Sequence, residues 1–292
     1  MKIGMTLPSM VAEYDAATTR RWCRRIDDGP YASVSVGERV TFRNQEQLVL
    51  LAAAAALTER VRIVATIVVL PLHPAVLVAK QMATLDVLAG GRLTVGVGVG
   101  GREHDYRSVG APFDHRLSRL DAGVASMRAI WAGSPPFEGA ESVGPRPVQP
   151  GGPPILCSSL GPQSLARAAR WADGLAGFTL AGDAAELAAT AAAVRASWAD
   201  AGREEAPTLM TSAWFSLGSD ADERHGRYVR DYMAIEPSLA NFMADAATIR
   251  SEAALLAALA AAEAAGFDEF MLVPTTSEEA ELDRLEAVLG RR

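Results

Sequence analysis

Two apolar segments separated by a helical pattern constrain this chain more than any other feature of its sequence. Ile63 to Leu70 and Leu93 to Val99 are rich in β-branched residues and too short to cross a membrane, which predicts strands buried on both faces. Between them, apolar residues recur at helical spacing until Gly90 and Gly91 end the pattern. Parallel strands need such a crossover, so we predict a βαβ unit that opens at the carboxyl ends of its strands.

The same alternation continues along the whole chain. Strands are expected at 2–7, 31–36, 61–69, 93–99, 154–158, 174–178, 208–217 and 269–273. Helices are expected at 12–26, 44–58, 75–88, 115–131, 162–171, 183–201, 220–235 and 278–289, with a further pair within 236–265. Alternation predicts a parallel sheet, and eight units predict its closure. We therefore expect an α/β fold, a (β/α)8 TIM barrel forming a single domain over residues 1–292, with extra helices before strand eight.

The composition disfavours several other classes of protein. The net charge of −7 argues against nucleic-acid binding, because a nucleic-acid backbone requires a basic surface. Pro71, His73 and Pro74 interrupt the longest apolar span, and Met1–Pro8 lacks the apolar core of a secretion signal. We expect a cytoplasmic protein that binds neither nucleic acid nor a membrane, with both cysteines reduced and Cys23 on a surface helix.

A loop of small residues follows the fifth predicted strand. It contains Ser158, Ser159, Gly161, Pro162 and Gln163, and a helical pattern follows at once. Hydroxyl and glycine residues just before a helix can present several backbone N–H groups to one anion, and the helix dipole favours negative charge there. We interpret the loop as a phosphate site. The alternative is an ordinary helix cap with proline in the first turn.

Glycines gather at the end of the fourth predicted strand. Gly96, Gly98 and Gly101 fit the G-x-G-x-x-G pattern of dinucleotide-binding proteins. The pattern lies on a fourth strand, however, and Arg102 to Pro112 separates it from the next expected helix, which disfavours a Rossmann-type site. The glycines indicate close approach of the backbone to a cofactor, or easier packing of the barrel.

Polar side chains follow three strand ends, where barrel enzymes place their functional groups. Glu38 and Arg39 come after the second strand, His73 after the third, and His104 and Tyr106 beyond the glycines. Glu38, His73, His104 and Tyr106 are candidates for proton transfer. For His73, capping of the following helix is the alternative interpretation.

The chain lacks the residues that several classes of barrel enzyme require. Its two lysines, Lys2 and Lys80, lie at no expected strand end, which argues against a Schiff-base aldolase. Its four histidines are scattered, with His115 and His225 on expected helices facing solvent, so we expect no metal site. A barrel with a phosphate site and few acid–base groups indicates that a cofactor carries the reaction.

The segment from Leu70 to Gly133 resembles the central signature of the bacterial luciferase-like monooxygenase superfamily, which includes coenzyme F420-dependent oxidoreductases. The resemblance extends through RPVQPGGPPIL and SLGPQSLARAARWADG, and in weaker form over nearly the whole chain. It implies a (β/α)8 barrel that binds F420 or FMN at its carboxyl face and acts on a small organic substrate.

The resemblance also implies site residues. The loop Ser158–Gln163 would hold the cofactor phosphate, and the glycine-rich loop Gly98–Gly101 would run along the cofactor. Strand three of such proteins often carries a bulge with a non-proline cis peptide beneath the cofactor ring, which would fall near Thr66–Val69 here. The cofactor-binding residues implied on these strands are Thr66, Val68, Val69, Gly98, Gly100 and Gly101.

Two departures from luciferases bear on the cofactor. Luciferases have a histidine where this chain has Arg39, and an arginine where it has Val99. Both favour F420, whose acidic tail could meet Arg102, Arg107 and Arg116. The resemblance thus favours hydride transfer between F420 and its substrate. The alternatives are an FMN-dependent monooxygenase served by a separate flavin reductase and a noncatalytic cofactor-binding barrel.

Relatives often dimerise through their second and third helices. The alanine-rich segment 52–56 lies on the second expected helix and is compatible with such a homodimer.

Overall fold

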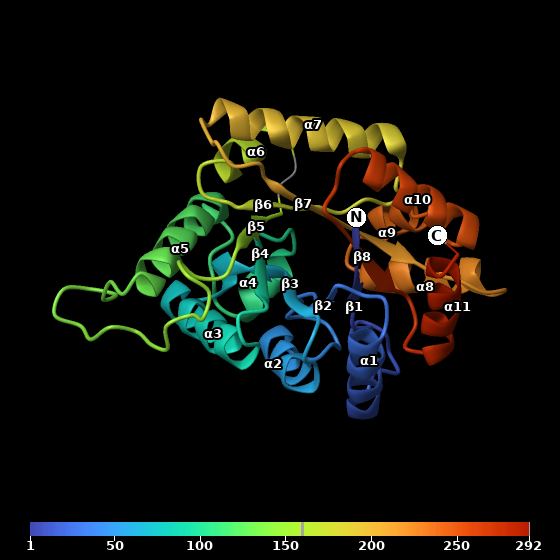
Figure 1. Ribbon diagram of the computed structural model, residues 1–292, viewed down its shortest axis with the longest axis horizontal. Coiled ribbons are helices and arrows are strands. Elements are labelled where there is room, and N and C mark those ends of the chain that lie inside the picture. The colour runs from blue at the N-terminus through green and yellow to red at the C-terminus, as the bar shows by residue number, and fades with distance from the viewer. Residues whose placement is uncertain (159–160, 292) are drawn as a thin grey trace.

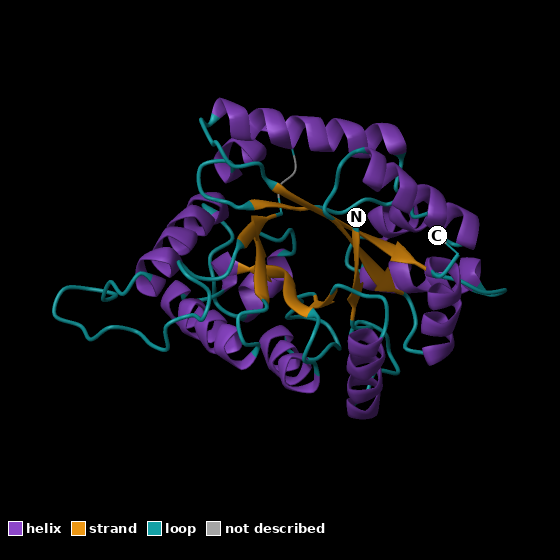
Figure 2. Cartoon of the chain, viewed as in Figure 1, coloured by secondary structure: helices purple, strands orange, loops and turns teal. Residues whose placement is uncertain are grey.

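The computed structural model describes residues 1–158 and 161–291. Strands β1 to β8 form a closed barrel in which each strand pairs in parallel with the next along the chain, and β8 (Glu269–Pro274) returns to pair with β1 (Lys2–Thr6). The helices surround this barrel (Figure 1, Figure 2). The predicted α/β fold and its closure into a (β/α)8 TIM barrel are confirmed.

The elements follow the predicted ranges, mostly with shorter ends. The other strands are β2 (Ser33–Val36), β3 (Arg62–Val69), β4 (Leu93–Gly98), β5 (Ile155–Cys157), β6 (Gly174–Ala176) and β7 (Thr208–Phe215). The helices are α1 (Ala16–Asp28), α2 (Gln47–Leu57), α3 (Ala75–Leu88), α4 (Glu103–Ser108), α5 (Arg116–Trp131), α6 (Pro162–Ala168), α7 (Ala184–Asp200), α8 (Ala221–Tyr232), α9 (Pro237–Ala246), α10 (Glu252–Ala264) and α11 (Glu279–Leu289). Helices α9 and α10 are the expected pair before β8.

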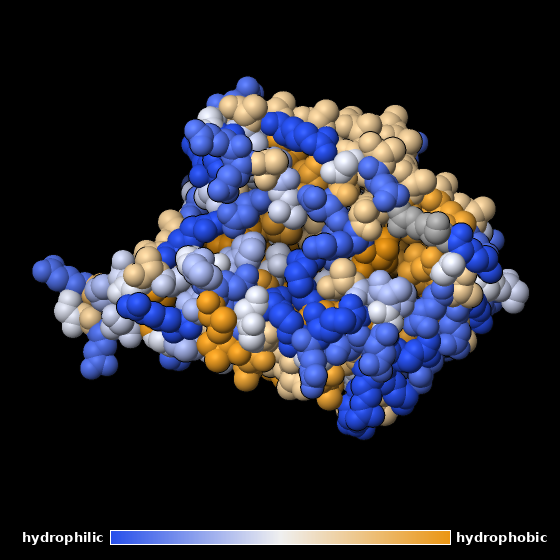
Figure 3. Space-filling model, in the orientation of Figure 1, coloured by the Kyte–Doolittle hydropathy of each residue, from blue (hydrophilic) through white to orange (hydrophobic). Residues whose placement is uncertain are grey.

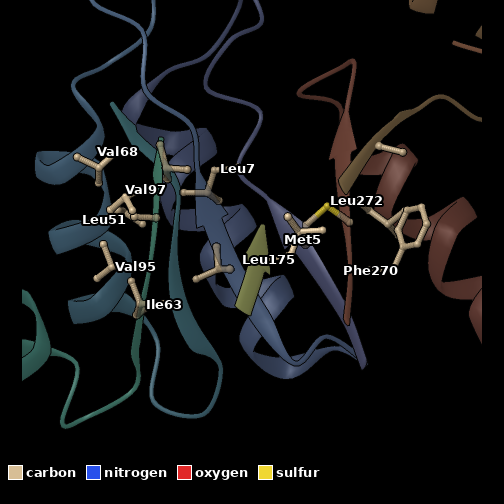
Figure 4. Close-up of a cluster of buried hydrophobic side chains, with 14 of the residues drawn as sticks. Met5, Leu7, Leu51, Ile63, Val68, Val95, Val97, Leu175, Phe270 and Leu272 are labelled. Atoms are coloured by element: carbon tan, nitrogen blue, oxygen red, sulfur yellow. The ribbon is translucent and has the colours of Figure 1, made fainter. Parts of the chain in front are cut away.

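The core has two layers. A large apolar cluster lies between the strands and the helices, and Figure 4 shows part of it, including Leu51 of α2 with Val95 of β4. A smaller cluster takes one residue from each of five strands, so it fills the barrel itself. Its members are Val64, Leu156, Ala176, Met210 and Met271. The bulge residue Ile67 packs on this cluster, which places Ile67 at the top of the filled interior.

Helix α4 differs from the sequence prediction. Residues 102–112 were expected to be a connection without a helix, but Glu103–Ser108 is helical. Asp105 and Tyr106 are its two buried residues, and Asp105 accepts hydrogen bonds from the backbone and hydroxyl of Thr41. Six residues are too few to produce an apolar period, so tertiary contacts determine this helix.

Cys23 lies on the outer helix α1, as expected, and its side chain is buried because α1 packs Trp22, Cys23 and Ile26 against the barrel. His225 is also buried rather than facing solvent, and burial lowers its pKa to about 4. His115 is exposed as expected, but it lies just before α5 in the left-handed region rather than within the helix.

The connection between α5 and β5 contains no helix or strand, as its proline and glycine content predicts, and it extends far from the barrel in Figure 1. Within residues 1–158 and 161–291, no helix has the length and apolar character needed to cross a membrane.

Candidate cofactor site and active site

Strand β3 is irregular where it reaches the rim of the barrel. Its pairing with β4 shifts register between Ala65 and Val68, and the peptide bond between Thr66 and Ile67 is cis. The bulge and the non-proline cis bond implied by the family resemblance are therefore confirmed in position. The side chain of Ile67 lies against Gly98 of β4.

The rim glycines have different roles. A Cβ atom on Gly98 would lie 2.3 Å from Ile67 Cδ1, and one on Gly100 would lie 2.9 Å from Val69 Cγ1. Gly100 also has a φ of +59°, which L side chains rarely adopt. A Cβ atom on Gly101 would meet no heavy atom within 4 Å. Gly98 and Gly100 thus allow β4 and its loop to pack on β3, whereas Gly101 leaves open space.

That space belongs to two pockets. The α5–α6 pocket has a volume of about 340 Å³, and its polar lining residues are Asp121, Ser158, Ser164 and Arg167. The rim pocket has a volume of about 600 Å³ and lies between the ends of β2 and β3, α4 and the corner between α8 and α9. Ile67, Gly100 and Gly101 line both pockets, so the two meet over the bulge of β3. Volumes of this size are typical of sites for small-molecule ligands.

A smaller cavity extends the site over the mouth of the barrel. It has a volume of about 120 Å³, is lined by Thr66, and shares Tyr232 with the rim pocket. Of the other implied cofactor residues, Val69 lines the rim pocket, whereas Val68 is buried in the layer between strands and helices.

Glu38 and His73 form a hydrogen-bonded pair beside the rim pocket. Glu38 lines the pocket; its Oε1 lies 2.6 Å from His73 Nε2, and its Oε2 accepts a hydrogen bond of 2.5 Å from the Val69 N–H. The Glu38 side chain is 7% exposed and that of His73 28%. Helix α3 has no side-chain cap, so His73 orients Glu38 instead of capping the helix.

The pKa of His73 depends on burial and on Glu38. Burial on its own lowers the pKa of His73, but the hydrogen bond and negative charge of Glu38, with a further contribution from Glu46, outweigh burial and raise the pKa above its ordinary value. A protonated His73 donates from Nε2 and fixes the carboxylate that faces the pocket. The pair can therefore hold a proton next to bound substrate.

The other two candidates for proton transfer differ from each other. Tyr106 lines the rim pocket, but its hydroxyl donates to the Val99 carbonyl and its ring packs edge-on against Phe113. His104 is exposed at the pocket rim, where it is open to solvent. The structure thus brings all four candidates to one region, and Glu38 is the buried carboxylate among them.

The sequence placed Arg39 among the polar residues after the second strand and marked it as a departure from luciferases. Its guanidinium lies between two rings, 4.5 Å from the centroid of Phe42 and 4.1 Å from that of Tyr232, and it donates to the Tyr232 carbonyl at the end of α8. It also lines the rim pocket. Sequence reasoning had no signal for this contact, because Tyr232 follows Arg39 by 193 residues.

The expected phosphate loop opens onto the α5–α6 pocket. Ser158 lines this pocket, and its N–H donates to the Val97 carbonyl. Gly161 has a φ of +80° immediately before α6, whose first residue is Pro162, and Gln163 is exposed. Ser159 lies outside the described residues.

Sequence reasoning did not assign four residues that line the α5–α6 pocket, namely Asp121, Ser164, Arg167 and Trp171. Arg167 pairs with Asp121, and Trp171 Nε1 donates to Asp121 at 3.1 Å. Ser164 and Arg167 lie one helical turn apart on α6 and face the pocket together. The spacing of Ser164 and Arg167, directly after a loop expected to bind phosphate, was the sequence signal that could have identified them.

The three arginines suggested for an acidic tail have different surroundings in the structure. Arg102 lines the rim pocket and lies 3.5 Å from Asp105. Arg107 is exposed, and Arg116 stacks over Phe113 at 4.0 Å. No group of three histidine, cysteine or acidic side chains among the described residues has the geometry to hold a metal ion.

The parallel eight-stranded barrel, with this bulge and these joined pockets at its rim, places the chain in the (β/α)8 class, whose ligand sites lie at the carboxyl ends of the strands. Residues 1–286 match the model of the Luciferase-like monooxygenase family, so the chain belongs to that family of oxidoreductases.

Relatives match over part of the chain. An uncharacterized protein of Mycobacterium tuberculosis (strain H37Rv) is 33% identical over 176 residues, which cover 58% of this chain and 61% of the relative. Pyrimidine monooxygenase RutA of Escherichia coli is 34% identical over 142 residues, or 44% of this chain and 38% of RutA. The chain therefore spans less than two thirds of the length of these relatives.

Solved structures share the fold over their full length. An F420-dependent secondary alcohol dehydrogenase, in complex with an F420–acetone adduct, superposes with a TM-score of 0.81 at 18% identity and covers 99% of this chain and 98% of that one. Monooxygenase RslO1 from Streptomyces bottropensis gives a TM-score of 0.78 at 22% identity, covering 100% and 98%. At these identities the likeness shows the fold alone.

Proposed function

We propose that this protein, in one domain spanning residues 1–292, is a cytoplasmic F420-dependent oxidoreductase that transfers hydride between F420 and a small organic substrate. The observation that carries the proposal is the junction of the two pockets over Ile67 and Gly101, with hydroxyl and arginine side chains on one side and a buried carboxylate on the other. This arrangement fits a planar ring at the bulge of β3 with its phosphate arm directed between α5 and α6.

The residues present fit such a cofactor. Ser158, Ser164 and Arg167 supply donors for a phosphate in the α5–α6 pocket, and Gly101 leaves room for a ring system close to the backbone. Gly98 and Gly100 contribute by packing on β3. When bound, F420 supplies or accepts a hydride at a ring carbon.

The chain's own residues supply the rest of the chemistry. Reduction of a carbonyl group adds a hydride to its carbon and a proton to its oxygen, and oxidation of the alcohol removes both. Glu38 faces the rim pocket and can take or return that proton, while His73 Nε2–H and the Val69 N–H hold the carboxylate in place. The apolar side chains of Ile67 and Val69 exclude water from this part of the pocket.

An FMN-dependent monooxygenase supplied by a separate reductase is the second candidate. It is favoured by the sequence match to pyrimidine monooxygenase RutA. Arg39 and Val99, which replace residues of luciferases, support F420 instead.

Equilibrium titration of the purified protein with F420 and FMN in parallel tests the proposal. We expect sub-micromolar binding of F420 and weaker binding of FMN. A sub-micromolar preference for FMN, with oxygen consumption in the presence of a flavin reductase, would overturn the F420 assignment. Tight binding without turnover over a broad substrate panel would indicate a noncatalytic barrel.

We also propose that the protein forms a homodimer through α2 and α3. Val49 of α2 and Leu77 and Leu88 of α3 are exposed apolar residues, and Figure 3 shows apolar side chains gathered over α3. Light scattering coupled to size exclusion should give twice the chain mass, and a Leu77→Glu/Leu88→Glu variant should give the monomer mass.

A further inference from the structure

Arg39 is a buried cation without a counter-charge. Arg39 is 6% exposed. Within the part of the chain that the structure describes, its side chain makes no ion pair and a single hydrogen bond, which Nη1 donates to the Tyr232 carbonyl. Its Nε has no hydrogen-bond partner. Burying a charge costs free energy unless a partner of opposite charge is present. The rings of Phe42 and Tyr232 compensate part of this cost through cation–π contacts.

The two buried carboxylates of the rim pocket already bind other groups, so they are not counter-charges for Arg39. Glu38 is bound by His73 and the Val69 N–H, and Asp105 is bound by Thr41 and Arg102. The remaining two, Glu103 and Glu236, are exposed at the rim and solvated. Both buried carboxylates of the pocket, Glu38 and Asp105, therefore have partners of their own, and neither neutralises the charge of Arg39.

The rim pocket has an extended apolar lining beside the polar side chains of Arg102, His104 and Tyr106. Val69, Ile67 and the α8–α9 corner, with Met233, Ile235 and Leu239, line the same pocket as Arg39. A ligand that matches this lining has an apolar body and one anionic end. Arginine binds carboxylates well because its planar donor groups match a planar anion.

We propose that Arg39 holds a carboxylate of the substrate in the rim pocket, so that the substrate is a small organic acid with an apolar body. The inference rests on the proposed function, because it assigns the rim pocket to substrate and the α5–α6 pocket to the cofactor phosphate.

The test measures binding of carboxylates to the cofactor-free protein. Acetate, hexanoate and benzoate are each compared with the corresponding neutral amide by calorimetry and ligand-observed NMR. At least one acid should bind about tenfold or more tightly than its amide, the range expected for a charge-assisted hydrogen bond. Absence of a preference for any acid over its amide would overturn the proposal.

Three variants separate charge from structure. Arg39→Gln keeps an N–H donor for the Tyr232 carbonyl but removes the charge, so it should abolish the preference for the acid; Arg39→Lys should retain part of it. Arg43→Met is the matched control, because Arg43 stacks on the same Phe42 at 4.7 Å but pairs with Asp231 outside the rim pocket. If Arg39→Gln retained the full preference, Arg39 would serve only to fix the end of α8.

A cofactor titration of the same variants distinguishes the two sources of an anion. F420 and FMN should bind Arg39→Gln as tightly as the parent protein, within about threefold, a difference well under 1 kcal/mol. If Arg39→Gln lost affinity for both F420 and benzoate, the anion that Arg39 binds would belong to the cofactor, and the substrate assignment would be overturned. Failure of the parent protein to bind either cofactor would refute the proposed function without affecting the carboxylate measurement.

Discussion

The pair formed by Glu38 and His73 should make stability depend on pH in a defined direction. Glu38 raises the pKa of His73 in the folded protein above its value in the unfolded chain. The folded state therefore binds the proton more tightly, and the resulting stabilisation is fully present below the unfolded pKa of about 6.5 and is lost as the pH rises through the folded pKa. A His73→Gln variant removes this charge but keeps an N–H donor for Glu38.

The structure sets the size of the effect. The hydrogen bond of 2.6 Å joins two largely buried groups, and a hydrogen bond to a charged group contributes about 1.5–3 kcal/mol. Since glutamine retains a neutral hydrogen bond, His73→Gln should lower the free energy of unfolding by about 1 kcal/mol near pH 6 and by much less near pH 9.

Urea unfolding at the two pH values measures this difference. His104→Gln is the control, because His104 is exposed at the same rim and should show no such change between pH 6 and pH 9. In a Glu38→Gln background, the effect of His73→Gln should disappear. A destabilisation by His73→Gln that is equal at both pH values, or larger near pH 9, would refute the reasoning.

Three further predictions concern backbone space and burial. Gly101→Ala should leave the melting temperature unchanged, because the added Cβ atom enters open space. The same variant should bind F420 more weakly by about 1 kcal/mol in a fluorescence titration. Equal binding would show that Gly101 does not lie in the cofactor site. Gly174→Ala places a Cβ atom 2.0 Å from the Thr208 carbonyl oxygen. It should therefore lower the free energy of unfolding, measured with urea, by more than about 3 kcal/mol, or prevent folding. A variant as stable as the parent would contradict the barrel geometry. Burial lowers the pKa of His225 to about 4, so the free energy of unfolding should fall as the pH decreases from about 6.5 to that value. The His225→Phe variant should lose about 2 kcal/mol less than the parent over this interval, as measured by thermal melts at several pH values. If stability fell equally with pH in both proteins, His225 would not contribute.

The barrel itself could be predicted because its signal is repeated and local. The apolar run that became β3 and the helical spacing that became α3 each carry their own period, and eight such units leave few other topologies. Helix α4 was missed because six residues carry no period and its position depends on the contact of Asp105 with Thr41.

The candidate site was predicted as a region but not as a set of contacts. Strand ends brought Glu38 and His73 together as expected, yet nothing in the sequence showed that one orients the other. The packing role of Gly98 was stated as an alternative, and the contact with Ile67 supports it. The environment of Arg39 depends on α8, which lies far along the chain, so only the folded structure could reveal it.

We propose that the two pockets that meet over β3 hold one phosphate-bearing ring cofactor. A crystal structure of the protein with F420 tests it most directly. We predict electron density for the ring against Ile67 and Gly101, with the phosphate next to Ser158 and Arg167. Ring density at any other part of the surface, with the two pockets filled only by water, would contradict the account.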